Sequence, residues 1–104
     1  MSDPVVVLAV FTPTEGRREE LREALVASIP AVHAEDGCEL YAIHDGADGV
    51  IYMIEKWTTV ADLDRHGTGE AVAALRGATA GLSAGVEVTR MAPIAAGTVE
   101  QGLL

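Results

Sequence analysis

Residues 38–57 read CELYAIHDGADGVIYMIEKW and decide the predicted fold, because they have the pattern of a β-hairpin. Segments 38–46 and 50–57 are rich in the apolar, β-branched and aromatic residues that favour strands. Between them, residues 45–49 read DGADG, and glycine and aspartate accept the positive φ angles of a tight hairpin turn. The stretch therefore predicts two antiparallel strands that pair directly.

The segments on either side of the hairpin extend this pattern to a whole domain. They predict a strand over 5–12, a helix over 15–35, a helix broken into 58–66 and 70–82, and a last strand over 85–94. The order β-α-β-β-α-β predicts an α+β fold of the ferredoxin-like class, in which helices cover one face of a four-stranded antiparallel sheet.

The length of 104 residues suits one domain. We expect a single domain over residues 1–94. The segment 95–104 has little pattern and two glycines, so we expect a tail that is either loose or laid against a partner subunit.

Helix boundaries and helix faces can also be predicted. Thr14 is a candidate cap for the first helix, and Thr59 with Asp62 has the spacing of a capping box for the shorter helix. In the first helix, apolar residues recur at three- and four-residue spacing; they are Leu21, Leu25, Ile29 and Val32. We expect this stripe to face the sheet.

The predicted sheet is apolar on both faces, although the helices can cover only one. In the second hairpin strand, Ile51 and Met53 lie on one face, while Tyr52 and Ile54 lie on the other. A bare apolar sheet is larger than the patches that monomers normally expose. We therefore expect a homodimer, packed sheet to sheet or sharing edges in a β-barrel. The alternative is a monomer with a moderately apolar open face.

Composition excludes several classes of partner. The net charge is −9, from 16 acidic and 7 basic residues, which disfavours nucleic acid and anionic membrane surfaces. The apolar run 5–11 is shorter than a membrane-spanning helix and follows no basic segment. Cys38 is the single cysteine, so no disulfide forms within the chain. We expect a cytoplasmic protein.

The junction between the hairpin and the shorter helix gathers the residues best suited to chemistry. His66 follows Val60 and Leu63 at helical spacing, so we expect all three to point inward. His66 is then either a core or capping histidine, or a proton acceptor in a cavity. Trp57 shares strand parity with Glu55 and is either a core aromatic or a flat wall for a planar substrate.

Three further side chains have one structural and one functional interpretation each. Glu55 either orients His66 or forms an ion pair with a neighbouring strand, for example with Arg90. Tyr41 forms a hydrogen bond at the cavity or at the dimer interface. Arg76 reaches either the mouth of the cavity or the solvent.

The remaining histidines give no indication of a metal site. The three histidines, at positions 33, 44 and 66, lack the short paired spacing of metal ligands. Residues 67–69 read GTG but lack the lysine and the longer pattern of a phosphate-binding loop.

Residues 34–72 resemble the antibiotic biosynthesis monooxygenase (ABM) domain family, which includes small quinol monooxygenases. The family pattern runs acidic–x–Gly–Cys–x–x–Tyr, then a hairpin, then Glu–x–Trp, with a histidine about nine residues after the aromatic residue. The matching positions are Glu35, Gly37, Cys38, Tyr41, Glu55, Trp57 and His66. The resemblance extends over roughly residues 4–94.

This resemblance implies a dimeric α+β barrel with one cavity per subunit. Some members oxidise phenolic, quinol-like compounds with O2 and use no metal, flavin or haem. Applied to this sequence, the resemblance makes His66 the candidate catalytic residue, with Trp57, Glu55, Tyr41 and Arg76 as candidate substrate-binding residues. The expected partners are a small aromatic molecule and O2, without a cofactor.

Other functions on the same fold stay open. Haem-degrading members resemble the chain, but they use an asparagine and an iron-ligating histidine; this sequence has no asparagine, and Arg76 falls near the ligand position. Polyketide oxygenases of the family place polar residues where Met53 and Leu63 stand here. A dimeric ligand-binding module without turnover is the non-enzymatic alternative.

Overall fold

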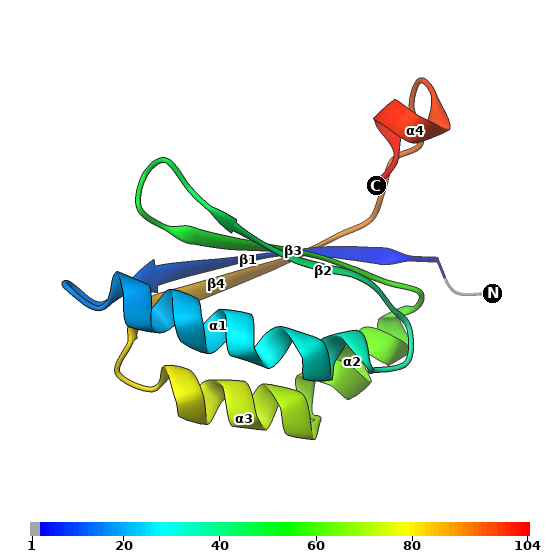
Figure 1. Cartoon of the computed structure of the whole chain (residues 1–104). Coiled ribbons are helices and arrows are strands. Elements are labelled where there is room, and N and C mark those ends of the chain that lie inside the picture. Colours follow the sequence, from blue (N-terminus) through cyan, green and yellow to red (C-terminus); the bar gives the residue numbers. More distant parts are fainter. Residues whose placement is uncertain (1–2) are drawn as a thin grey trace.

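The structure, a computed structural model, describes residues 3–104. Residues 1 and 2, which the domain prediction includes, lie outside the described part. The elements are β1 (Val5–Pro13), α1 (Arg18–His33), β2 (Cys38–Asp45), β3 (Ile51–Trp57), α2 (Val60–Gly67), α3 (Glu70–Thr79), β4 (Ser83–Met91) and α4 (Val99–Gly102). The first seven elements follow the predicted order (Figure 1), and the α+β ferredoxin-like fold is confirmed. The predicted end of the domain at residue 94 stays a prediction.

The four strands form one antiparallel sheet in the order β2-β3-β1-β4. Strand β3 is therefore a central strand, and β1 pairs with it from Val5 opposite Trp57 to Phe11 opposite Ile51. Because side chains alternate between faces, Ile51, Met53, Glu55 and Trp57 all point to one side, and all four are buried.

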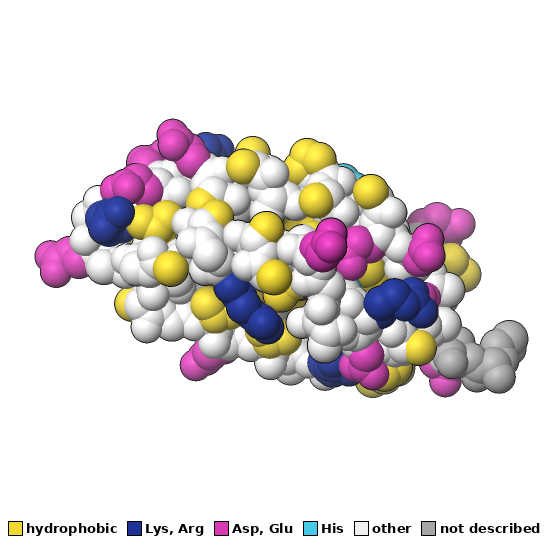
Figure 2. Space-filling view, turned by 90° about the horizontal axis from the view of Figure 1, so that it is seen from below, with side chains coloured by type: hydrophobic (Ala, Val, Ile, Leu, Met, Phe, Trp, Pro, Cys, Tyr) yellow, Lys and Arg dark blue, Asp and Glu magenta, His cyan; other side chains and the backbone are white. Residues whose placement is uncertain are grey.

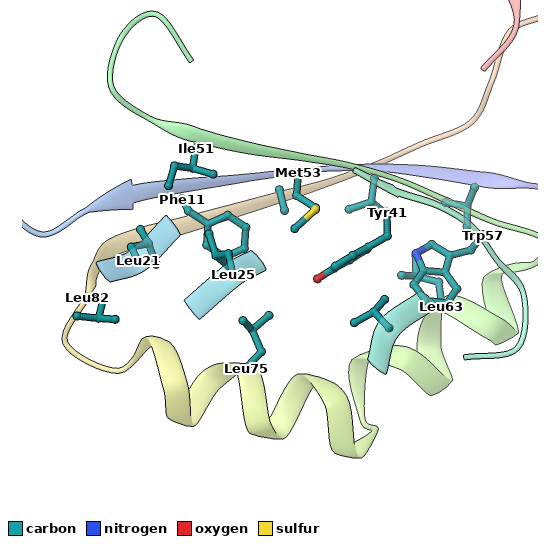
Figure 3. Close-up of a cluster of buried hydrophobic side chains, with 14 residues drawn as sticks. Phe11, Leu21, Leu25, Tyr41, Ile51, Met53, Trp57, Leu63, Leu75 and Leu82 are labelled. Carbon is teal, nitrogen blue, oxygen red and sulfur yellow. The ribbon is translucent and has the colours of Figure 1, made fainter. Parts of the chain in front are cut away.

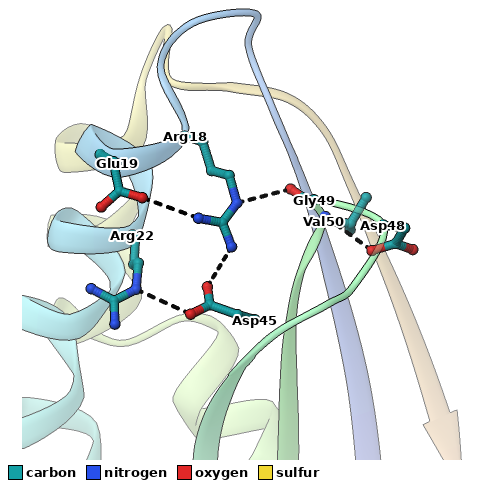
Figure 4. Close-up of polar contacts among 7 residues, drawn as sticks. All are labelled: Arg18, Glu19, Arg22, Asp45, Asp48, Gly49 and Val50. Carbon is teal, nitrogen blue, oxygen red and sulfur yellow. Dashed lines mark hydrogen bonds and ion pairs between the residues drawn. The ribbon is translucent and has the colours of Figure 1, made fainter.

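The hairpin turn between β2 and β3 is tied to the start of α1 (Figure 4). Arg18 donates to the carbonyl oxygen of Gly49 at 3.2 Å and to Asp45 at 2.6 Å, and Arg22 donates to Asp45 at 3.4 Å. Gly49 has a φ angle of 84°, which is the positive value predicted for the turn. Two arginines on one helix face thus fix the angle of α1 across the hairpin.

Helix α1 begins later than the sequence predicted, because Thr14 does not cap it. The Thr14 hydroxyl donates instead to the carbonyl oxygen of Gly81 at 3.0 Å, which ties the end of β1 to the segment before β4. A turn through Gly16 follows, and the helix starts at Arg18 with Arg17 as its cap residue. The predicted apolar stripe does face the sheet, with Leu21, Leu25 and Val32 fully buried and Ile29 partly buried.

Helices α1, α2 and α3 lie together on one side of the sheet, and the core lies between them and the strands (Figures 1 and 3). The labelled core side chains come from both layers; they are Phe11, Leu21, Leu25, Tyr41, Ile51, Met53, Trp57, Leu63, Leu75 and Leu82. We call this side of the sheet the covered face.

The opposite side, the open face, has no helix over most of its area (Figure 1). Leu8, Val10 and Ile54 point to it and are only half-buried. The C-terminal segment lies beyond one end of the sheet, where Ile94 is 82% exposed and Val99 is 71% exposed. The open face therefore has the apolar character that the sequence predicted.

A β-bulge at the start of β2 changes the alternation of its side chains. Cys38 lies opposite Trp57, whereas Leu40 lies opposite the neighbouring residue Lys56, so one extra residue is accommodated between them. As a result, both Cys38 and Tyr41 face the helices, although three positions separate them. The bulge thus allows Tyr41 to join the covered face.

In residues 3–104, no helix is both long enough and apolar enough to cross a membrane. The cytoplasmic location stays a prediction.

Candidate functional site

A cavity of about 400 Å³ lies between the covered face of the sheet and helices α2 and α3. Most of its lining is apolar and includes Val7, Phe11 and Leu75. The ionisable lining residues fall into two groups by exposure. Tyr41, Glu55 and His66 are 4%, 5% and 7% exposed and form what we call the cavity floor, while the exposed Arg76 and Arg90 form the cavity rim.

Helix α2 carries His66 to the floor. The Thr59 hydroxyl accepts a hydrogen bond from the Asp62 backbone N–H at 3.1 Å, which confirms the predicted cap. Leu63 and His66 point inward as predicted, but Val60 is 46% exposed, and its predicted inward orientation is wrong. At 3.6 residues per turn, six positions rotate the side chain by roughly 120° from His66, so the two do not share a face.

The partner of His66 is Glu35, which follows the end of α1. The Nδ1 atom of His66 lies 2.9 Å from the Oε1 atom of Glu35. Because a carboxylate accepts hydrogen bonds, Nδ1 is the donor in the neutral ring, and Nε2 carries the lone pair. Nε2 is then the ring atom that can take a proton from a molecule in the cavity.

Two aromatic rings hold the imidazole in place. The centroid of the Trp57 ring is 4.6 Å from that of His66, with planes inclined by 33°, and the Tyr41 ring meets His66 edge-on at 5.7 Å. Trp57 is 0% exposed and does not line the cavity. Trp57 lies opposite Cys38 at the end of β3, so its indole supports the imidazole and does not form the flat cavity wall that was one of its two expected roles.

Glu55 is a buried carboxyl group in the floor. Its Oε1 atom accepts a hydrogen bond from Trp57 Nε1 at 3.0 Å. Burial raises the pKa of Glu55, an effect that the hydrogen bond from Trp57 partly opposes. The predicted ion pair between Glu55 and Arg90 does not form, since Arg90 pairs with Asp64 at 2.8 Å. The carboxylate that contacts Nδ1 of His66 is that of Glu35, not that of Glu55.

Tyr41 lies opposite Glu55 across the β2–β3 pair, and its ring points from the sheet into the space above Leu75 (Figure 3). Within the described part of the chain, its hydroxyl has no hydrogen-bond partner, although the side chain is 4% exposed. Burial raises the pKa of Tyr41, and the negative charges of Glu55 and Glu35 raise it further. Tyr41 thus belongs to the cavity, and its hydroxyl is free for a ligand.

The rim is formed from two different elements. Arg76 projects from α3 and Arg90 from β4, and the cavity lining also includes Val86 and Val88 of β4, which are 50% and 62% exposed. The cavity therefore opens along the outer edge of the sheet. Of the two predicted positions for Arg76, the structure places it at the cavity mouth.

Two parts of the site were not predicted from the sequence. Glu35 was identified as a motif position, but nothing in the sequence indicated its contact with a residue 31 positions away. Arg90 was considered only as an ion-pair partner; its parity on β4, opposite the inward-facing Val7, could have indicated its position at the cavity. Within residues 3–104, no three His, Cys, Asp or Glu side chains are grouped as metal ligands would be.

Comparison with known proteins identifies the family. The antibiotic biosynthesis monooxygenase (ABM) family matches residues 4–78, and the chain belongs to this family. It is 39% identical over 67 residues to a Mycobacterium tuberculosis protein named "Putative monooxygenase Rv0793". That match covers 64% of this chain and 66% of the relative, so slightly less than two thirds of the relative is spanned.

Solved structures show the same fold over nearly the whole chain. The structure of Rv0793 from Mycobacterium tuberculosis has a TM-score of 0.83 and 33% identity, and the match covers 92% of this chain and 100% of that one. The crystal structure of PA3566 from Pseudomonas aeruginosa also has a TM-score of 0.83, with 30% identity over 91% of this chain and 98% of that one.

Proposed function

We propose that this protein is a monooxygenase that oxidises a small phenolic or quinol-type compound with O2, without a metal, flavin or haem. One observation carries the proposal: a buried imidazole, held at Nδ1 by Glu35, lines an apolar cavity of about 400 Å³. Cavities of a few hundred Å³ with a small number of polar groups are the usual sites for small organic ligands.

The proposed reaction begins with a proton transfer. The phenolic hydroxyl gives its proton to Nε2 of His66, and Glu35 stabilises the imidazolium that forms. The phenolate then transfers one electron to O2, and the resulting phenoxyl radical and superoxide combine at a ring carbon to form a peroxide. The O–O bond breaks, the ring carbon loses its hydrogen as a proton, and a quinone and one water molecule are formed from one phenol and one O2.

In this proposal the protein supplies a base, a fixed orientation and a dry cavity. Trp57 and Tyr41 restrict the rotation of the imidazole, and the apolar lining keeps bulk water from the radical pair. The free hydroxyl of Tyr41 provides a hydrogen bond that fixes the oxygen of the substrate beside His66. Electrons come from the substrate itself.

The test is O2 consumption with a panel of hydroquinones and naphthols. We expect His66→Ala to lower kcat/KM by about 10²–10⁴-fold, the usual contribution of a general base. His44→Ala, which removes an exposed histidine on β2, is the matched control and should match the wild type. If no compound is oxidised faster than in buffer, the proposal fails, and binding without O2 uptake would establish the non-catalytic alternative.

We also propose that the protein functions as a homodimer that buries the open face, with the tail of residues 95–104 against the partner subunit. The half-buried Leu8, Val10 and Ile54 on the open face support this arrangement, as do the exposed Ile94 and Leu104 near the C-terminus. Burial of these side chains against a second copy removes apolar surface that a monomer would leave in water.

A further inference from the structure

We propose that the substrate carries an anionic substituent, such as a carboxylate or sulfonate, which Arg76 and Arg90 bind at the cavity rim while the hydroxyl faces His66. The inference rests on the proposed function for its hydroxyl end and extends it by naming the class of compound: an acidic hydroxyaromatic. Four features of the structure support it.

The first feature is that Arg76 forms no ion pair with a carboxylate in residues 3–104. The chain has seven basic residues, and six of them form ion pairs with carboxylates in the structure; they are Arg17, Arg18, Arg22, Lys56, Arg65 and Arg90. Within residues 3–104, Arg76 is the basic residue that has no such pair. In a chain with 16 acidic residues, a guanidinium left without a carboxylate beside an apolar cavity is available for an anionic ligand.

The second feature is the weakness of the competing pair at Arg90. The side chains of Arg90 and Asp64 are 50% and 61% exposed, and exposed ion pairs contribute little free energy because water and salt screen them. A ligand carboxylate at the rim can therefore bind Arg90 together with Asp64, or it can replace Asp64 as the partner of Arg90. Arg76 on α3 and Arg90 on β4 then bind the anion from two different elements that line the cavity.

The third feature is the sign of the charge in the floor. Glu55 lies in the floor, and Glu35 contacts His66 from behind. Their negative charges raise the pKa of Tyr41, so they also disfavour an ionised substituent beside it. The anionic group of an acidic aromatic is thus repelled by the cavity floor and attracted by the cavity rim. The compound therefore binds in one orientation, with its hydroxyl group toward the floor.

The fourth feature is the surface around the opening. On the helical side of the molecule, basic side chains lie next to hydrophobic atoms, and acidic side chains form separate clusters on the same face (Figure 2). Val86 and Val88 on β4 line the same cavity as the two arginines and are well exposed. An aromatic ring can pack on these valines while its acidic group reaches the guanidinium groups.

The experiment compares a dihydroxybenzoate with its methyl ester, which differ in charge but not in their hydroxyl groups. Binding to the full chain is measured by titration calorimetry at low salt. We expect the acid to bind about tenfold more tightly than the ester, as is typical of a charge-assisted hydrogen bond at a partly exposed site. Arg76→Gln should remove most of this preference, and Arg76→Lys should restore part of it.

Arg17→Gln is the matched control, because it removes one positive charge from an exposed pair with Glu20 outside the cavity lining. The preference for the acid should persist in this variant. Equal binding of acid and ester to the wild type, or a preference that survives Arg76→Gln, would overturn the inference.

O2 uptake measured on the same two compounds separates this inference from the proposed function. If the acid binds with the expected dependence on Arg76 but is not oxidised, the anion site is supported and the monooxygenase proposal is contradicted for this class. If neutral quinols are oxidised and acids show no advantage in kcat/KM or affinity, the monooxygenase proposal stands and the anion site is rejected.

Discussion

Each face of the sheet carries some side chains that most half-buried sheets place on the other face. The covered face, which packs on the helices, carries the ionisable side chains Glu55, Tyr41 and Arg90. The open face, which the helices leave bare, carries apolar residues such as Leu8 and Ile54. In an antiparallel sheet with one wet side, polar residues normally face the water.

These exceptions on the two faces have two different explanations. Polar groups placed under the helices are costly to bury unless they are paired or serve a ligand, so their presence there marks a site. Apolar groups placed on the bare face are costly to leave in water, so their presence there marks an interface. One strand, β3, contributes to both faces by alternation: Glu55 and Trp57 point to the site, and Ile54 points away from it.

The largest expected effect is on the covered face, at Trp57. Trp57→Ala removes a side chain that is 0% exposed and also removes the hydrogen bond to Glu55. We expect the free energy of unfolding to fall by about 3–5 kcal/mol, as for other large-to-small core substitutions. Urea denaturation measures it, with Val26→Ala on the exposed side of α1 as the control. A loss below about 1 kcal/mol would show that Trp57 is not a core residue.

The second effect concerns the open face. Ile54→Glu introduces a charge at the centre of the proposed dimer interface, where it would be buried without a partner. We expect the dissociation constant of the dimer to rise by about 100-fold, measured by sedimentation velocity. Val26→Glu places the same charge on the helical side and should leave association unchanged. If Ile54→Glu is as dimeric as the wild type, the open face is not the interface.

The third effect returns to the covered face. Glu35→Gln keeps the size of the side chain and an acceptor oxygen, but it removes the charge that stabilises the imidazolium of His66. We expect kcat/KM for quinol oxidation to fall about tenfold, with little change in substrate affinity. Glu39→Gln neutralises an exposed carboxylate on β2 and serves as the control. Unchanged turnover in Glu35→Gln would mean that the contact with His66 is only structural.

The smallest effect is a pH dependence of stability at Glu55. Burial raises the pKa of Glu55 in the folded state above its ordinary value of about 4.3. As pH rises, the unfolded chain therefore loses this proton first, and Glu55 lowers stability above pH 4 but not below it. Glu55→Gln keeps an acceptor for Trp57 and should be more stable than wild type at pH 7.

This advantage of Glu55→Gln should disappear near pH 3.5, where Glu55 is largely protonated in both states. Parallel urea titrations at the two pH values measure the difference. An equal difference at both values would indicate that burial does not hold the proton on Glu55.

The architecture could be predicted because it depends on local patterns. Strands and helices impose a period on apolar residues, as seen in the alternation within 38–57 and in the stripe of Leu21 and Leu25. The turn at 45–49 is recognised by its residue types. The start of α1 could not be predicted in the same way. Thr14 is a good cap by residue type, but a tertiary contact with Gly81 takes its hydroxyl.

The sequence indicated which residues gather near the cavity better than it indicated which of them contact one another. His66, Tyr41, Glu55 and Arg76 do line one cavity, whereas Trp57 lies behind it. The pairing of Glu35 with His66 joins the end of α1 to the end of α2, and such a contact depends on how two helices pack. No spacing along the chain records that packing, so the predicted ion pair between Glu55 and Arg90 is wrong, while the predicted roles of the individual residues stay predictions.

The stacking of Trp57 on His66 also gives the molecule an optical reporter. Trp57 is the single tryptophan of the chain, and its ring centroid lies 4.6 Å from that of the imidazole. A charged imidazolium next to an indole quenches its emission by accepting an excited electron. The fluorescence of the native protein therefore follows proton transfer at the proposed catalytic base in real time, without a label and without knowledge of the substrate.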